Sequence, residues 1–215
     1  MASTFEAAVC KRYEALLGNA GYDCVARCSF QKSQGPTFGS LWFVRGTSSL
    51  SGRFMARLSV GLEAIGRDVA VLSVDLNQLD PEGKGQWYQW KDGSEESLAR
   101  VAQLLVSDAV PWLNRHTDLE ELIRTLQSRV AIVPPTHRRK WWQLGAAPAA
   151  EPRVNSNNLR YLSYCYEALG RYRDALEWWE RYVSTLTLLA PGSDQAKDTE
   201  KRGQYLAARA SHVSG

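Results

Sequence analysis

The pattern of apolar and polar positions changes twice along the chain and predicts three kinds of region. The first residues repeat apolar side chains at helical spacing until two glycines, Gly18 and Gly21, interrupt them. This pattern predicts an N-terminal helix, opened by a capping box of Ser3 and Glu6. From about residue 22 to residue 90 the chain switches to short β-rich runs, and beyond residue 94 helical spacing returns.

The β-rich runs predict an antiparallel meander. They are separated by clusters of Gly, Ser, Pro and Asp and read YDCVARCSF, SLWFVRG, GRFMARLSVGLEAI and DVAVLSVDL. In the third run apolar residues alternate with polar or bulkier ones, which indicates a strand with one buried face: Phe54, Ala56, Leu58 and Val60 against Arg53, Met55, Arg57 and Ser59.

Two helices are expected to follow the strands. One begins at Ser94, continues through apolar positions to Val110 and is broken near Pro111. A shorter one is capped by Thr117 and carries its apolar residues on one side, namely Leu119, Leu122, Ile123 and Leu126.

These regions predict an α+β protein in three parts. Residues 1–130 form an antiparallel sheet packed by about three helices, residues 131–156 form a basic connector rich in Pro and Ala, and residues 157–215 form a helical hairpin with a final helix. The net charge of +3 is unevenly distributed: residues 131 to 160 hold 5 Lys and Arg against 1 acidic residue, whereas acidic and basic residues nearly balance elsewhere.

The compartment is predicted from segments that the chain lacks. The N-terminus has no continuous apolar signal-peptide core, and no run approaches the 18 apolar residues of a membrane span. The four cysteines, Cys10, Cys24, Cys28 and Cys165, are too few and too scattered for a disulfide framework. We therefore expect a cytoplasmic protein that does not interact with membranes.

Residues 3–129 resemble a bacterial family known only as domain of unknown function 4304. The resemblance rests on the order of the elements and on a few anchors: Gly21-Tyr22, Phe54, Gly61, Trp87 and Pro111-Trp112-Leu113. The family has no established activity. Its members are often found beside polymorphic toxins, so the resemblance implies a role in immunity or bacterial competition.

Residues 157–190 are similar to a single tetratricopeptide hairpin. The first helix carries Leu159, Leu162 and Tyr166, the turn is Leu169-Gly170-x-Tyr172, and the second helix carries Ala175, Leu176 and Trp179. The resemblance places Trp179 in the core, which leaves its neighbour Trp178 without a core role. Tyr182 and Thr187 depart from the usual repeat, which has alanine and proline there. Because one repeat cannot bury its own faces, the hairpin must pack on the first domain, on a final helix over about 195–210, or on another chain.

Candidate catalytic and metal-binding chemistry is sparse. Cys24 and Cys28 share one face of a predicted strand and are interpreted as small packing residues, because no further ligand completes a metal site. His116, His137 and His212 fit no triad spacing. The segment DLNQLDPEGKG lacks the register of a calcium loop and is interpreted as a solvated turn, and no nucleotide-binding glycine motif occurs. We expect no cofactor and no metal.

The segment HRRKWW is the strongest functional candidate. Three fixed positive charges beside two tryptophans could bind an acidic protein surface rimmed by aromatic residues, or could bind the phosphates of a nucleic acid while a base stacks on a tryptophan. In the structural alternative, the two tryptophans pin the connector onto a hydrophobic groove. We favour protein over nucleic acid because three consecutive charges are a small basic footprint. The predicted partner-binding residues are Arg138, Arg139, Lys140, Trp141, Trp142, Tyr172 and Trp178.

The function that the sequence favours is stoichiometric protein binding, in an immunity or adaptor protein whose partner would be a toxin in the immunity case. The alternative is an enzyme, a hydrolase or nucleotide-processing protein with its site on the sheet; weak nucleic-acid binding through HRRKWW is the third hypothesis. A deep pocket with several convergent titratable side chains would favour the enzyme, and an exposed aromatic and basic strip would favour the binder.

Overall fold

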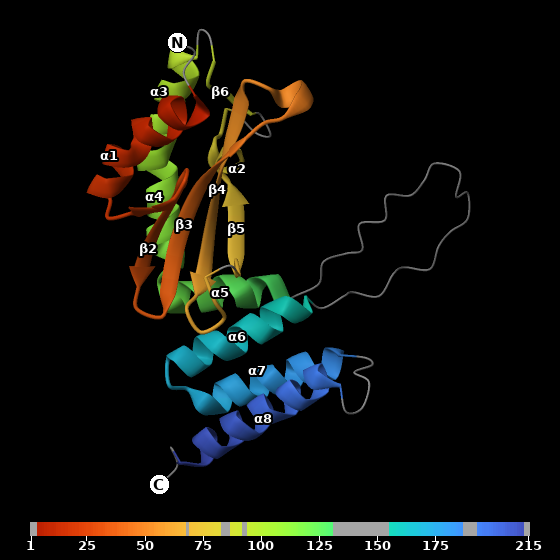
Figure 1. Cartoon of the computed structure of the whole chain (residues 1–215). Coiled ribbons are helices and arrows are strands. Elements are labelled where there is room, and N and C mark those ends of the chain that lie inside the picture. The colour runs from red at the N-terminus through yellow and green to blue at the C-terminus, as the bar shows by residue number, and fades with distance from the viewer. Residues whose placement is uncertain are drawn as a thin grey trace, which may run out of the picture. The chain divides into compact units, whose positions relative to one another are not determined.

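The protein is α+β, as predicted, and divides into two compact units, Met1–Glu121 and Leu122–Gly215. The computed structural model describes residues 4–67, 69–82, 87–91, 94–130, 155–186 and 193–212. The sheet with its helices makes up the first unit, and helices alone make up the second (Figure 1).

The sheet of the first unit is an antiparallel meander. Its strands follow one another in chain order, and a short last strand pairs with β4. The strands are β1 (Asp23–Ala26), β2 (Ser29–Gln34), β3 (Thr37–Arg45), β4 (Arg53–Leu62), β5 (Leu72–Asp75) and β6 (Tyr88–Gln89). The predicted meander is confirmed, although the run YDCVARCSF, predicted as one strand, is a hairpin of β1 and β2.

The predicted alternation on β4 is confirmed from Arg53 to Leu58 but not beyond. Phe54, Ala56, Leu58 and Val60 are all buried on one face, while Arg53 is exposed and Met55 and Arg57 are half-buried. Ser59, predicted on the less buried face, is buried as well, and its hydroxyl lies 2.7 Å from that of Ser40 on β3. The opposite face carries cross-strand polar pairs, since Arg57 Nε donates to Asp75 Oδ1 on β5 at 2.7 Å.

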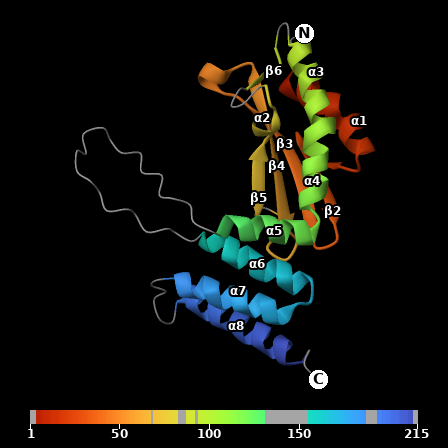
Figure 2. The same cartoon turned by 180° about the vertical axis from the view of Figure 1, so that it is seen from behind.

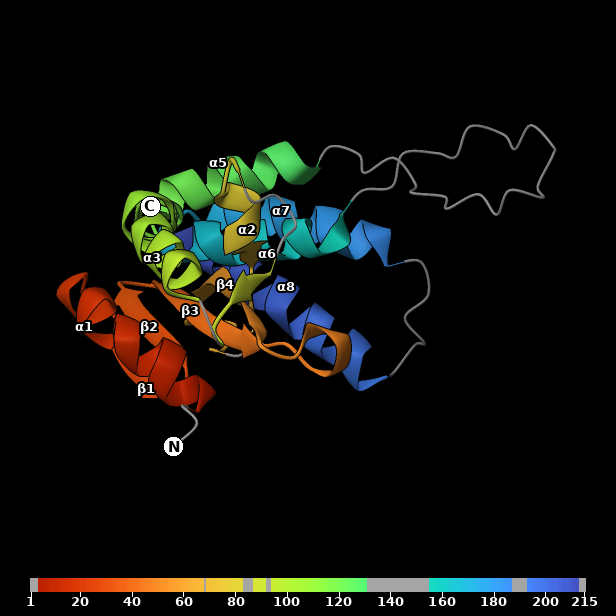
Figure 3. The ribbon, with the colours of Figure 1, turned by 90° about the horizontal axis from the view of Figure 1, so that it is seen from above.

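Helices of the first unit cover the buried face of the sheet. A π-helical turn, Glu6–Cys10, leads into α1 (Lys11–Asn19), which lies beside β1 and β2 (Figure 3). Helices α3 (Glu95–Leu104) and α4 (Val110–His116) lie across one face, in front of β3 when the molecule is seen from behind (Figure 2). The Tyr13 hydroxyl of α1 donates to the Leu98 carbonyl of α3 at 2.8 Å and so ties the two helices together.

Pro111 does not break its helix, contrary to the sequence prediction. A π-helical turn, Leu105–Ala109, precedes it, and the Val110 amide bonds to the Leu105 carbonyl five residues back. Pro111 then falls in the first turn of α4, where its missing N–H costs least. The wider turn therefore lets the helical path from α3 continue into α4.

The predicted cap of the next helix, α5 (Leu119–Val130), is also corrected. Asp118 Oδ1, not Thr117, accepts from the Glu121 amide at 2.9 Å. The Thr117 hydroxyl instead donates to the Leu113 carbonyl at 2.9 Å, and the Thr117 carbonyl accepts from Thr37 on β3 at 2.6 Å. Thr117 thus joins α4 to the sheet through its carbonyl, and its side chain is buried instead of capping α5.

The first unit has a core of interlocked aromatic rings. Ring centroids lie 5.3 to 6.1 Å apart, within the usual range for aromatic pairs, in a network of Phe5, Tyr13, Phe30, Phe43, Phe54, Tyr88 and Trp90. The rings come from the N-terminal helix, three central strands and the segment around β6, so the core forms only when the whole unit has folded.

The second unit stacks helices in succession. It contains the C-terminal part of α5 with α6 (Ser156–Ala168), α7 (Tyr172–Thr185) and α8 (Asp194–His212). Gln127 Nε2 of α5 donates to the Tyr166 hydroxyl of α6 at 2.9 Å. The predicted hairpin turn is present, and Gly170 adopts φ +72°, a conformation that glycine tolerates without strain.

The prediction that Trp179 rather than Trp178 is the buried tryptophan is confirmed. Trp179 is 6% exposed, and its Nε1 donates to the Thr199 carbonyl of α8 at 3.2 Å, whereas Trp178 is half-buried. The final helix covers the hairpin, one of the alternatives that the sequence left open, and contributes buried Leu206.

Candidate functional site

Five of the predicted partner-binding residues, Arg138 to Trp142, lie outside the described residues. The other two, Tyr172 and Trp178, lie on α7 six positions apart, so they point about 120° away from each other. Tyr172 accepts a hydrogen bond from Arg209 Nη2 of α8 at 2.8 Å, and Trp178 stacks with Arg181 at 4.0 Å. The two side chains therefore leave α7 in different directions.

A cleft of about 730 Å³ opens where α6, α7 and α8 meet, and sequence reasoning did not find it. It is called here the basic–aromatic cleft. Four aromatic and three basic side chains line it: Tyr164, Trp179, Tyr182, Tyr205, Arg160, Lys201 and Arg202. Asp198 is the one carboxylate among its described lining residues, so the lining is basic on balance.

Arg202 organises the aromatic wall of this cleft. Its guanidinium carbon lies 3.6 Å from the centroid of the Tyr164 ring and 5.0 Å from that of Trp179. The Nη2 atom donates to Glu167 Oε2 at 2.7 Å, and both side chains are largely buried, 15% and 21% exposed. A guanidinium between ring faces and a carboxylate is held in one orientation, so Arg202 fixes the geometry of the cleft.

Two arginine side chains at the cleft each have an N–H group that donates to no described residue. The Nε atoms of Arg160 and Arg202 are buried, and neither has a hydrogen-bond partner among the described residues. Buried polar atoms without partners are rare in folded proteins and costly, which is why they often mark a place that a ligand or water completes. A carboxylate is the natural acceptor for such N–H groups.

Two tyrosines of the cleft, Tyr182 and Tyr205, differ in their exposure to solvent. Tyr182 is buried at 8%, whereas Tyr205 is 43% exposed. A ring that is open to solvent beside basic side chains is available to contact a partner.

A second cleft, of about 660 Å³, lies in the first unit between β6 and α3. Its centre is Asp80, which the sequence placed in a solvated turn but which is only 2% exposed. Arg100 Nη2 donates to Asp80 Oδ1 at 2.7 Å, the Glu82 amide donates to the same oxygen at 3.0 Å, and the Tyr88 hydroxyl lies 3.4 Å from Oδ2. Because both oxygens are engaged, Asp80 anchors the chain between α2 (Leu76–Leu79) and β6.

Burial also changes the pKa of the tyrosine in this second cleft. Desolvation of the phenol, with the neighbouring Asp80 carboxylate, raises the pKa of Tyr88 above its ordinary value. Hydrogen bonding to Asp80 raises the pKa of Arg100. The guanidinium therefore stays charged and the phenol stays neutral across the physiological range, which suits a structural cluster.

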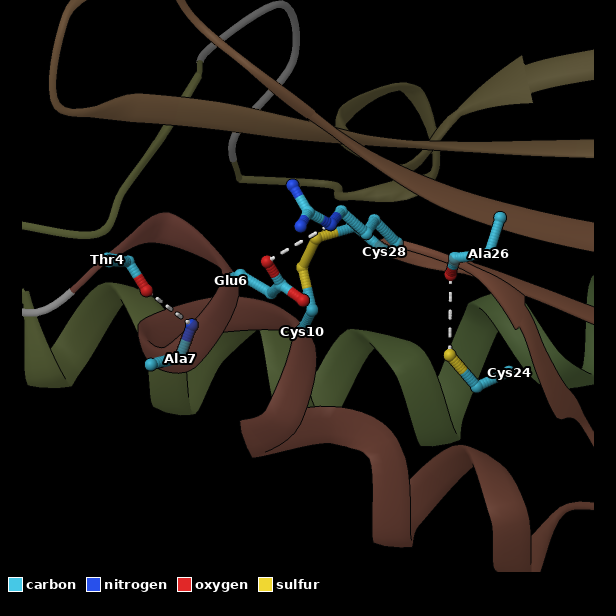
Figure 4. The surroundings of a disulfide bond; sticks show 8 residues. Thr4, Glu6, Ala7, Cys10, Cys24, Ala26 and Cys28 are labelled. Atoms are coloured by element: carbon cyan, nitrogen blue, oxygen red, sulfur yellow. Dashed lines mark hydrogen bonds and ion pairs between the residues drawn. A yellow bond between two sulfur atoms is a disulfide. The ribbon is translucent and has the colours of Figure 1, made fainter.

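The cysteines correct the sequence interpretation. Cys10 and Cys28 form a disulfide that ties the N-terminal helical segment to the turn between β1 and β2 (Figure 4). Cys28 is therefore no simple packing residue of a strand, and it adopts φ +57° in that turn. Cys24 is exposed and lies apart from the disulfide, with its Sγ 3.3 Å from the Ala26 carbonyl. Cysteine spacing did not predict this disulfide, because the β1–β2 hairpin brings Cys28, and not Cys24, to the helical segment that carries Cys10.

Metal-binding clusters and membrane-spanning helices were sought among the described residues. Within the described ranges, no group of three or more His, Cys, Asp and Glu side chains is arranged to hold a metal ion. Among the same residues, no helix has both the length and the apolar character needed to cross a membrane.

Comparison of the chain with protein-family models, curated protein sequences and solved structures found no match.

The residues that sequence reasoning missed are those of the basic–aromatic cleft on α6 and α8. One signal was available in the sequence, since Arg160 and Tyr164 are four residues apart on α6, and Arg202 and Tyr205 are three apart on α8. Such pairs place a cation and a ring on one helix face. Which of these faces would meet depended on how α8 packs, and the sequence left that open.

Proposed function

We propose that this protein is an intracellular protein-binding module that recognises a partner stoichiometrically and has no catalytic activity of its own. The observation that carries this proposal is the basic–aromatic cleft, because it combines exposed aromatic surface with basic side chains. Tyr, Trp and Arg are also the residue types that dominate the energetics of protein interfaces. We expect no cofactor and no metal to be needed.

The partner surface that fits this cleft is an acidic segment with an aromatic or apolar side chain. Carboxylates would accept from Arg160 and Lys201, and the apolar group would contact Tyr205 and Trp179. The basic residues would speed association, while the aromatic contacts would slow dissociation. Arg138 to Trp142, Tyr172 and Trp178 stay part of the proposal as predicted partner contacts outside the cleft.

The cellular role that we propose is that of an immunity or adaptor protein. This part rests on the resemblance of residues 3–129 to a family found beside polymorphic toxins, and its test is genetic. Where a toxin domain is encoded beside this protein, co-expression with that toxin should restore growth, and the double variant Arg160→Ser, Lys201→Ser should not restore it. Growth that is equally poor with and without the protein would exclude the immunity role.

The binding proposal is tested by selection from a random library of peptides about 12 residues long. The immobilised protein should enrich peptides that contain Asp or Glu together with an aromatic residue, because these match the cleft. The double variant Arg160→Ser, Lys201→Ser should lose this enrichment, with affinity for a selected peptide falling about tenfold or more. Enrichment of basic peptides, or unchanged selection by the variant, would refute the assignment.

A matched control separates this effect from a general change in charge. Lys197 lies on the same helix as Lys201, is exposed and does not line the cleft. Lys197→Ser should therefore leave peptide affinity within about twofold of wild type. A loss from Lys197→Ser as large as that of the double variant would indicate nonspecific attraction to α8.

The cytoplasmic location belongs to the same proposal and has its own test. Disulfides are rare in reducing compartments, so the Cys10–Cys28 pair is the observation that weighs against it. Trapping free thiols in cells before lysis should show the pair reduced if the protein works in the cytoplasm. A fully oxidised pair would instead place the folded protein in an oxidising compartment.

A further inference from the structure

Gly203 occupies an unexpected position in the middle of α8. Glycine is among the poorest residues in a helix interior, and here it stands near the centre of a helix that runs from Asp194 to His212. Its place is not required by packing against α7: a Cβ built on it would lie 3.6 Å from Trp179 Nε1 and 3.7 Å from Cδ1, which is ordinary contact. Alanine would therefore fit the folded chain and favour the helix.

The missing side chain deepens a groove on the outer side of the α7–α8 pair. This α7–α8 groove has a volume of about 730 Å³ and an almost wholly apolar lining. Its apolar residues are Leu176, Trp179 and Val183 on α7 and Ala196, Gly203 and Ala207 on α8. Small residues on α8 let another backbone approach closely, as the packing of ridges into grooves requires.

The rim of the groove is acidic. Glu180 on α7 and Glu200 on α8 are both exposed, and no Lys or Arg is among the described residues that line the groove. Glu200 also accepts from Gln204 Nε2 at 3.1 Å, which orients its carboxylate along the helix. The groove therefore differs in sign from the basic–aromatic cleft, although Trp179 contributes to both.

We propose that the α7–α8 groove binds an amphipathic helix of a partner protein, with a narrow apolar face and basic side chains on both sides of it. The apolar face would fill the space above Gly203, and the basic flanks would pair with Glu180 and Glu200. This inference does not rest on the proposed function, because the cleft takes a ligand of opposite charge. A partner with an acidic segment and a basic helix would engage both surfaces.

The test uses two synthetic helical peptides of about 18 residues, long enough to span the groove. Both carry Leu and Ala at helical spacing on one face; the first has Lys on both flanks of that face, and the second has Glu there. In fluorescence anisotropy the Lys peptide should bind the wild-type chain about fivefold to tenfold more tightly than the Glu peptide. Equal affinities for the two peptides would overturn the proposal.

Charge exchange at the rim sharpens this test. The double variant Glu180→Lys, Glu200→Lys should reverse the preference, so that the Glu peptide binds more tightly than the Lys peptide. Glu177→Lys is the matched control, since Glu177 is exposed on α7 but does not line the groove. An unchanged preference in the double variant, or a reversal by the control alone, would contradict the assignment.

Filling the groove separates binding from folding. Gly203→Ala should raise the melting temperature, because alanine favours the helix, and should lower the affinity for the Lys peptide severalfold. Gly203→Leu should abolish binding by occupying the space itself. Arg160→Ser, Lys201→Ser should leave this peptide's affinity unchanged, so a failure here is distinct from a failure of the cleft.

A second copy of the chain is the other occupant of the groove that the experiments can distinguish. If the groove pairs two copies, sedimentation of the full chain should show a dimer that Gly203→Leu converts to monomer, and the peptides should compete with dimerisation. That result would overturn the proposal of a basic helix, since two acidic rims would then face each other. A monomer that binds the Lys peptide supports the proposal.

Discussion

The two units of this protein use their aromatic side chains differently. In the first unit, rings pack against rings, and Phe43 and Phe54 lie 6.0 Å apart at the centre of a buried network. In the second unit, arginines cover ring faces: Arg202 on Tyr164, Arg171 on Tyr166 and Arg209 on Tyr172. Cations also lie over rings in the first unit, as Arg45 and Lys91 do over Trp90. The units differ in exposure, because Tyr205 of the second unit is 43% exposed, whereas the described aromatic residues of the first unit are all buried or half-buried.

Buried polar groups are distributed more evenly. Asp80 in the first unit has its carboxylate oxygens engaged by Arg100, Tyr88 and a backbone amide. Buried side-chain nitrogens without described partners occur in both units: Gln31 Nε2 and Trp90 Nε1 in the first, and Asn158 Nδ2 and the Nε atoms of Arg160 and Arg202 in the second. The charged members of this set, the two arginines, both lie in the second unit, so we propose the first unit as a closed scaffold and the second as the binding surface. Three experiments can break or sharpen it.

The largest effect is expected at the anchor of the second unit. Trp179→Ala removes a ring that is 6% exposed and contacts both the hairpin and α8, so it should cost about 3 to 5 kcal/mol of unfolding free energy. Trp178→Ala, on the half-buried neighbour, should cost about 1 kcal/mol or less. Urea titration followed by circular dichroism measures both. A Trp178 variant that is destabilised as much as the Trp179 variant would mean that the second unit has no single anchor.

The next effect concerns the covalent link in the first unit. The Cys10–Cys28 disulfide closes a loop with a sequence separation of 18, which corresponds to about 3 kcal/mol of stabilisation. Dithiothreitol should lower the stability of wild type by about that amount and should not affect the variant Cys10→Ser, Cys28→Ser. Cys24→Ser, at the exposed free cysteine, is the control and should behave as wild type. Unchanged stability on reduction would show that the aromatic core alone holds the scaffold.

Sequence patterns predicted the sheet and the hairpin well because each depends on local periodicity. The alternation from Phe54 to Val60 marked β4, and Gly170 marked the hairpin turn. The wrong predictions concern residues whose environment is set by contacts with residues far away in the sequence. Thr117 was predicted to be a cap but bonds to a strand residue 80 positions away, Thr37, and Asp80 was assigned to solvent although Arg100 brings it into the interior.

The candidate site was harder to predict for a related reason. Its residues come from three helices, and only the packing of α8 brings Arg202 onto the ring of Tyr164. Consecutive basic and aromatic residues, as in Arg138 to Trp142, were the prominent candidates because adjacency is visible in a linear pattern. Clefts are assembled from residues three or four apart on separate helices, and no linear pattern fixes which helix faces meet.

The smallest effect tests whether the first unit is closed to water. Burial raises the pKa of Tyr22 above its ordinary value near 10, and desolvation is its sole cause. The folded state therefore keeps the phenol neutral while the unfolded chain ionises. The stability that this difference in pKa contributes is fully present below pH 10 and is lost as the pH rises above it, at about 1.4 kcal/mol per pH unit for each such tyrosine.

Tyr22→Phe cannot ionise, so between pH 10 and pH 11 its unfolding free energy should rise by about that amount relative to wild type in urea titrations. Tyr161→Phe, on half-buried Tyr161 of α6, is the matched substitution in the second unit. Parallel stability curves for wild type and Tyr22→Phe would show that water reaches this phenol, and the first unit would then be no more closed than the second.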